Sequence, residues 1–170
     1  MTFQRTAYGL AAIAVVAAGV GTPASAQAPV AAPPPTPYGP TITIEASKRV
    51  AAAAVAEARR NNWFMAVAIV DPAGDLVYFE KMDNTQAASV AIAIDKARSS
   101  ARFKRPTKAM QDVLAAGGDG LRFLALNGAI PAEGGVPVMM DGKIVGAIGV
   151  SGGSGQQDNQ TAMAGVGAVK

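Results

Sequence analysis

Histidine and cysteine are both absent from the 170-residue sequence. The chain therefore cannot form a Ser-His-Asp triad, a zinc site built on thiolates or imidazoles, or a disulfide. Its stability must come from core packing or from contacts between subunits, although an exported protein could have used disulfides.

Charge and aromatic residues are also scarce. The formal net charge is only +3, and aromatic side chains make up 5% of the sequence. The basic residues do not cluster with aromatic ones, as they do in many nucleic-acid-binding surfaces. We therefore expect no nucleic-acid partner.

The N-terminal segment has the order of residue types found in a secretory signal peptide. Arg5 is followed by an apolar run over residues 7–20 without an ionisable side chain, and an Ala-Ser-Ala motif stands at 24–26. The run is shorter than the roughly 20 residues that a membrane-spanning helix requires. We expect cleavage after residues 1–26, a mature protein that starts near Gln27 without a membrane span, and a periplasmic or secreted location. The alternative is an uncleaved anchor.

Residues 27–40 are rich in Ala and Pro, with three consecutive prolines at 33–35. Such a stretch favours an extended polyproline conformation and cannot bury a core. We interpret it as a linker and residues 41–170 as one folded domain.

Helical and hairpin signals alternate along this domain. Thr43 is a candidate N-cap, and Asp141-Gly142 is a strong hairpin turn between apolar segments. The pattern predicts an α/β (α+β) fold with a central antiparallel sheet packed with helices. Helices are expected at 43–61, 86–103, 107–115 and 156–166, strands at 64–70, 76–82, 136–140 and 143–151, a turn at 71–74, a loop at 117–120, and a strand or short helix at 121–126.

Several short motifs occur in a specific order between residues 41 and 165. They lie at 70–76, 81–83, 93–98, 134–138, 141–142, 145–152 and 157–158. This ordered series resembles the GlcG/HbpS family, which also includes the C-terminal domain of PduO. The resemblance implies a homo-oligomer with a central antiparallel sheet and, in the best-studied branches, haem binding outside the cytoplasm. Related domains are linked to cobalamin or glycolate metabolism, often without a known reaction.

The implied haem lacks its common axial ligand, because the chain has no histidine. Met82 and Tyr78 are conceivable iron ligands, and so are Met139 and Met140. Ordinary core packing is the more usual role of such residues, because Met is a common gap filler. The axial ligand and any metal site are therefore left unassigned.

Two glycine pairs and one lysine suggest an anion site. Gly134-Gly135 precedes a strand and Gly152-Gly153 lies between a strand and a helix, where backbone amides can approach a ligand. Lys96 projects away from the polar stripe of its helix and would supply the positive charge, and Asp83 could orient it by an ion pair. The site would hold a small carboxylate or a haem propionate. Tight turns and a snorkelling lysine are the alternatives.

No catalytic residue is assigned. Ser89 and Ser100 flank Lys96 on one helix, but nothing marks an oxyanion hole. The leading hypothesis is an exported haem-binding protein that buffers or senses haem. The alternatives are a haem-independent binder of a small organic acid and a structural subunit of an exported complex.

Overall fold

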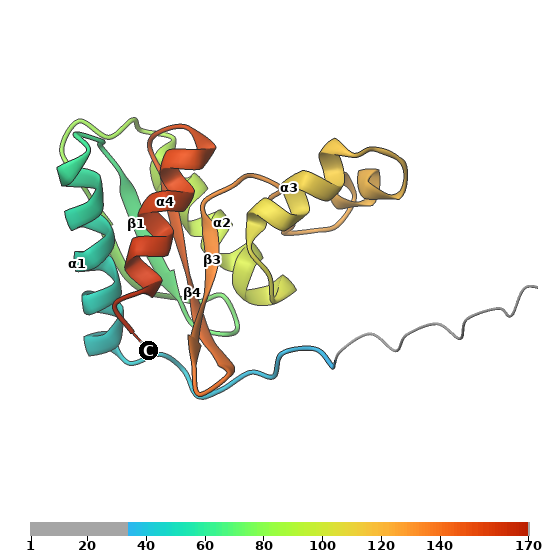
Figure 1. The fold of residues 1–170 in the computed structure, drawn as a ribbon, viewed down its shortest axis with the longest axis horizontal. Helices are drawn as coiled ribbons and strands as arrows, with labels where there is room; N and C mark the ends of the chain where they lie inside the picture. The colour runs from blue at the N-terminus through green and yellow to red at the C-terminus, as the bar shows by residue number, and fades with distance from the viewer. Residues whose placement is uncertain (1–33, 170) are drawn as a thin grey trace, which may run out of the picture. The chain divides into compact units, whose positions relative to one another are not determined.

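A four-stranded antiparallel sheet forms the centre of residues 34–169, the part of the chain that this computed structural model describes (Figure 1). Two hairpins lie side by side in it, in the strand order β2-β1-β4-β3. The two inner strands, β1 and β4, pair with each other. The strands are β1 (Ala66–Val70), β2 (Leu76–Lys81), β3 (Gly135–Met140) and β4 (Lys143–Ser151).

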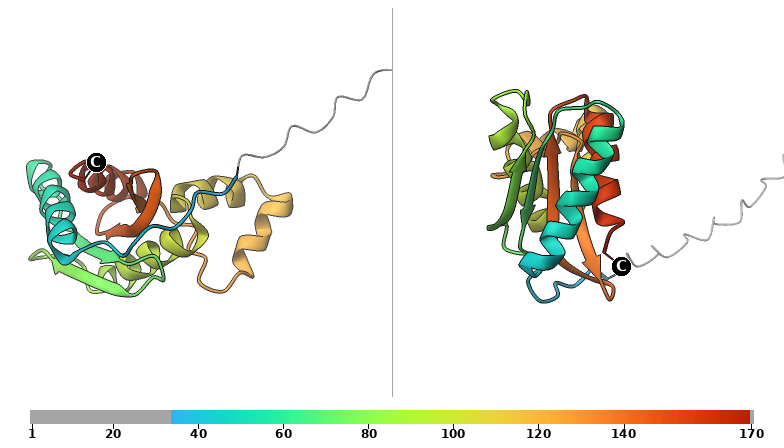
Figure 2. Two further views of the ribbon diagram at one scale, coloured as in Figure 1. Left: turned by 90° about the horizontal axis from the view of Figure 1, so that it is seen from below. Right: turned by 90° about the vertical axis from the view of Figure 1, so that its left-hand side faces the viewer.

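Helices cover both faces of this sheet (Figure 2). Helices α1 (Ile44–Arg60) and α4 (Gly155–Val166) pack on one face, and α2 (Ser89–Phe103) packs on the other. Strand β1 shows the alternation directly, because Val67 and Ile69 face α1 while Ala66, Ala68 and Val70 face α2. All of β1 is buried, as a strand covered on both faces requires. The predicted α+β architecture is confirmed.

The α2 face is packed through very small residues. Ala93, Ala97 and Ala101 are fully buried, on the face that the helical periodicity predicts. A Cβ atom built on Gly149 of β4 would lie 2.0 Å from the carbonyl oxygen of Ala93. Only glycine fits at this position, so the close approach of α2 to the sheet depends on it.

Local signals located most helix and strand boundaries to within three residues. Thr43 caps α1 by accepting the Ala46 N–H at 3.2 Å, and α3 spans Thr107–Ala115 as expected. One prediction needs correction. A 3₁₀ helix, η1, occupies Gly118–Leu124, where a loop was expected over its first residues.

Residues at the C-terminal end of the expected linker, near Tyr38, pair with the sheet. The Gly39 N–H donates to the Ile144 carbonyl at 2.8 Å, and Tyr38 forms a parallel bridge with Ile144. The Lys104 ammonium lies 4.1 Å from the centroid of the Tyr38 ring. Prolines remove N–H donors only at their own positions, so the residues between them can still bond to a strand.

The predicted signal peptide and the first part of the predicted linker lie outside the described residues. Among residues 34–169, no helix has both the length and the apolar character needed to cross a bilayer.

Candidate functional site

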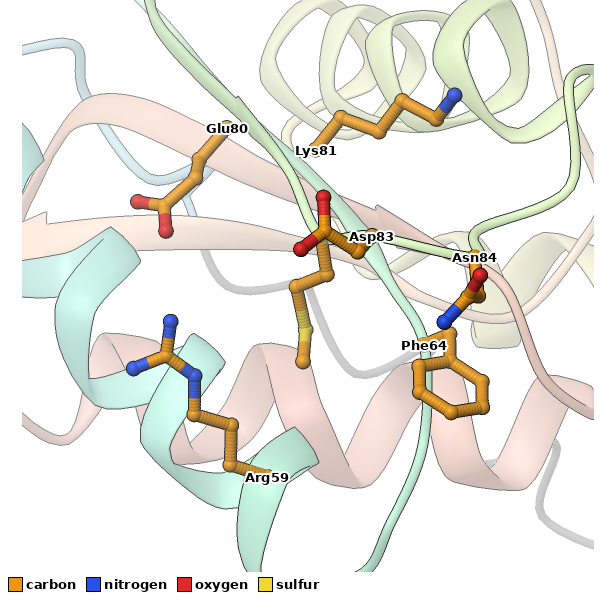
Figure 3. Close-up of a pocket in the computed structure, with 7 residues that line it drawn as sticks. Arg59, Phe64, Glu80, Lys81, Asp83 and Asn84 are labelled. Atoms are coloured by element: carbon orange, nitrogen blue, oxygen red, sulfur yellow. The ribbon is translucent and has the colours of Figure 1, made fainter.

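A pocket of about 390 Å³ opens where the end of α1 approaches the end of β2 (Figure 3). Two of the predicted site residues, Met82 and Asp83, line it. The full lining comprises Arg59, Phe64, Glu80, Lys81, Met82, Asp83 and Asn84.

The lining combines two cations, two carboxylates, an aromatic ring and a thioether. Arg59 and Glu80 point toward each other in Figure 3, whereas Lys81 points to the other side of β2, as strand alternation requires. The Phe64 side chain is 48% exposed, which is high for an aromatic residue. Met82 is half-buried and follows the last residue of β2. The charges of Arg59 and Lys81 are balanced by those of Glu80 and Asp83, so the pocket offers charged groups of both signs beside apolar surface.

Lys96 lies inside the protein and does not snorkel at the edge of the core. Its Nζ atom is 2.7 Å from Oδ2 of Asp158, and both side chains are 4% exposed. The same Nζ donates to the Val150 carbonyl at 3.1 Å. Because α2 supplies the lysine and α4 supplies the aspartate, the ion pair joins helices on opposite faces of the sheet.

Both predicted glycine loops converge on this ion pair. A Cβ on Gly134 would lie 3.0 Å from the Lys96 Nζ atom, and the Gly153 N–H donates to Oδ1 of Asp158 at 3.0 Å. The structure therefore brings Lys96 and the two loops together, but the carboxylate between them is Asp158 of the chain itself. Asp158 occupies the place that the prediction gave to a bound carboxylate.

Asp83 does not take part in this cluster, and the suggested ion pair between Asp83 and Lys96 is replaced by the one with Asp158. The sequence reasoning missed Asp158 as a site residue. The available signal was an acidic residue in the first turn of a helix that directly follows a glycine-rich loop.

The other glycines of these loops serve close packing. The Gly135 N–H donates to Oγ1 of Thr107 at 2.8 Å, and a Cβ on Gly135 would lie 2.4 Å from the Lys96 carbonyl oxygen. A Cβ on Gly152 would lie 2.1 Å from the carbonyl oxygen of Phe64. The Gly152 loop thus rests on a residue that lines the pocket.

Burial raises the pKa of the Asp158 carboxyl, while the hydrogen bonds from Lys96 and Gly153 act in the opposite direction. The Tyr78 hydroxyl donates to Glu80 at 3.2 Å. Burial and the Glu80 charge raise the pKa of Tyr78, which disfavours the phenolate that would bind iron.

The remaining candidate residues lie elsewhere or are bonded to other groups. Met139 is 38% exposed on β3, and Met140 lines a different pocket near the hairpin turn. Ser89 shares a hydrogen bond with Ser151 at 3.2 Å, and Ser100 donates to the Arg105 carbonyl. Neither serine is positioned by Lys96, so the geometry offers no Ser-Lys nucleophile.

Residues 34–169 contain no group of three or more carboxylates that could hold a metal ion, and the sequence has no Cys or His.

Residues 42–167 match the family model described as "Haem degrading protein HbpS-like". The chain belongs to this HbpS-like family. GlcG of Escherichia coli K12 is 36% identical over 109 residues, which cover 62% of this chain and 80% of GlcG. The resemblance predicted from the ordered motifs is thereby confirmed.

Solved structures of the HbpS-like family share the fold. A double mutant of HbpS from Streptomyces reticuli superposes with a TM-score of 0.72 at 31% identity, over 86% of this chain and 99% of that one. The PduOC:haem complex superposes with a TM-score of 0.69 at 26% identity, over 76% of this chain and 96% of that one.

The buried ion pair can be tested by Lys96→Met, which keeps an unbranched side chain and removes its charge. The Asp158 carboxyl then stays buried without its cation, and we expect the free energy of unfolding to fall by about 3–5 kcal/mol. Chemical denaturation measures this loss.

Lys108→Met is the matched control, because Lys108 pairs with Asp112 at the surface of α3 and should lose far less stability. The double variant Lys96→Met/Asp158→Leu should recover part of the loss. Equal stability of the Lys96 and Lys108 variants would contradict a structural role for the buried pair.

Proposed function

We propose that this HbpS-like protein binds haem in the pocket between α1 and the end of β2, and that it buffers or senses haem outside the cytoplasm. The observation that carries the proposal is family membership together with a structural relative that is a haem complex. A cation, an exposed aromatic ring and a thioether at the pocket add support.

Three pocket residues support haem as the ligand, namely Arg59, Phe64 and Met82. Haem is a flat apolar ring with two anionic propionates, and Arg59 is the pocket cation on the side of β2 where Glu80 lies, whereas Lys81 points to the other side of the strand (Figure 3). The exposed Phe64 ring offers a surface for stacking, and the volume of about 390 Å³ falls within the usual range of about 300–1,000 Å³ for ligand pockets. Haem would supply the iron centre, and the protein residues would hold and orient the ring.

Met82 is the residue of this pocket whose side chain is a known type of haem ligand. Methionine is one of the two axial ligands in cytochromes c, so an axial position of the haem iron can be filled by a residue other than histidine. Tyr78 is less suitable because its hydroxyl bonds to Glu80 and its pKa is raised. We therefore place Met82 first among the candidate axial ligands.

Titration of haemin into the protein tests this function, with the Soret band as the readout. We expect a saturable shift of the Soret band in the parent protein. Met82→Leu should alter the position of this band, because the thioether is lost while the side-chain volume stays similar. Arg59→Gln should bind haemin more weakly. Arg49→Gln, on the same helix but outside the pocket, is the matched control. A spectrum that equals free haemin at every ratio would falsify the proposal.

We propose export by a signal peptide at residues 1–26, supported by the pattern of Arg5, the apolar run and the Ala-Ser-Ala motif. Expression of the full chain in a Gram-negative host should yield a periplasmic protein whose first residue is Gln27, as measured by intact mass and N-terminal sequencing. Ala26→Arg should block cleavage. A chain that keeps residues 1–26 in the cytoplasm would argue against export.

We also propose a homo-oligomer. A segment that includes α3 and η1 projects from the sheet after α2 (Figure 1), and two of its leucines are exposed. Leu124 is 72% exposed and Leu121 is 54% exposed, which is costly unless a partner covers them. Sedimentation should give a multiple of the 17.1 kDa chain mass or of its processed form. Leu124→Glu should reduce the mass of the assembly, whereas Met163→Glu, on α4, should leave it unchanged. A monomeric parent protein would overturn this assignment.

A further inference from the structure

A second pocket, of about 240 Å³, lies between the start of α1 and the β3–β4 turn. These two elements lie together at the lower edge of the molecule in Figure 1. Arg49 lines this pocket and Arg59 lines the proposed haem pocket, ten residues further along α1. At 1.5 Å per residue the two arginines are about 15 Å apart along the helix, so the pockets are separate.

The floor of this second pocket is apolar and its rim is mainly basic. Ile42 and Val145, each 3% exposed, contribute the floor. Arg49 and Lys143 contribute two positive charges to the lining, against the single negative charge of Asp141. Thr43, the N-cap of α1, also lines the pocket, so the positive end of the helix dipole adds to this excess.

The walls are held in place before any ligand arrives. The Ile42 N–H donates to the Val145 carbonyl at 2.8 Å, which ties the segment before α1 to β4. The turn is tight, since Asp141 and Gly142 have φ values of 50° and 71°. The side chain of Lys143 runs past Gly39, where an added Cβ would lie 3.0 Å from the Lys143 Cβ. Such preorganisation lowers the entropy that binding costs.

We propose that this pocket binds a small amphipathic carboxylate, with its apolar part on Ile42 and Val145 and its carboxylate between Arg49 and Lys143. The volume lies just below the usual range of about 300–1,000 Å³, which favours a ligand smaller than haem or a drug-sized molecule. The apolar floor favours a carboxylic acid over inorganic phosphate, which has no apolar part to bury. This site is independent of the proposed haem function.

Calorimetric titration of the protein with hexanoate tests the site, with hexanamide and inorganic phosphate as comparators. We expect saturable binding of one hexanoate per chain, with hexanamide about tenfold weaker because it lacks the charge. Phosphate should bind more weakly than hexanoate. Equal binding of hexanamide, stronger binding of phosphate, or no saturable binding of hexanoate would each overturn the proposal.

Variants locate the binding to this pocket. Arg49→Gln and Lys143→Gln, both at exposed positions, should each weaken hexanoate binding several-fold, and Met140→Trp should block it by filling the pocket. Arg59→Gln is the matched control on the same helix and should bind hexanoate as the parent does. Circular dichroism checks folding, and if Met140→Trp does not fold, the two glutamine variants decide. Unchanged affinity in both of them would reject the site.

Discussion

The ion pair between Lys96 and Asp158 is the contact on which the arrangement of this domain depends. It joins α2 and α4, which cover opposite faces of the sheet, at 2.7 Å and almost out of contact with water. Two charges in such a place are tolerated only when hydrogen bonds satisfy them, and the Val150 carbonyl and the Gly153 amide do so. The backbone at Gly134 must then pass within reach of the lysine, which leaves no room for a side chain.

This arrangement also connects the glycine-rich motifs to the proposed haem pocket. Gly152 packs directly against the carbonyl of Phe64 at the pocket wall, and the N–H of the next residue, Gly153, donates to Asp158. The glycines that resembled an anion-binding cradle in the sequence therefore hold an internal carboxylate and support the neighbouring wall. The two surface pockets proposed to bind ligands lie at opposite ends of α1, with Arg59 at one end and Arg49 and Lys143 at the other.

Local structure was predictable wherever a local interaction decides it. The Thr43 cap, the Asp141-Gly142 turn and the alanine face of α2 act within a few residues of sequence, and all three are present in the structure. The first residues of the 3₁₀ helix at Gly118–Leu124 were predicted as a loop because their glycines signal a loop more strongly than a tight helix. The pairing of Tyr38 with Ile144 was missed because a proline-rich composition favours an extended linker, and it gives no sign of which residues between the prolines pair with a strand.

The sequence by itself determined the element order, the antiparallel hairpins and the family, because caps, turns and an ordered set of motifs are properties of neighbouring residues. Only the tertiary structure decided the partner of Lys96. Asp158 stands 62 residues further along the chain on another helix, and no periodicity relates the two positions. Their meeting follows from how closely α2 and α4 pack around the end of β4, which depends on the absence of side chains at Gly134 and Gly149. That physical dependence on packing is why an apparent ligand site in the sequence is an internal ion pair in the fold.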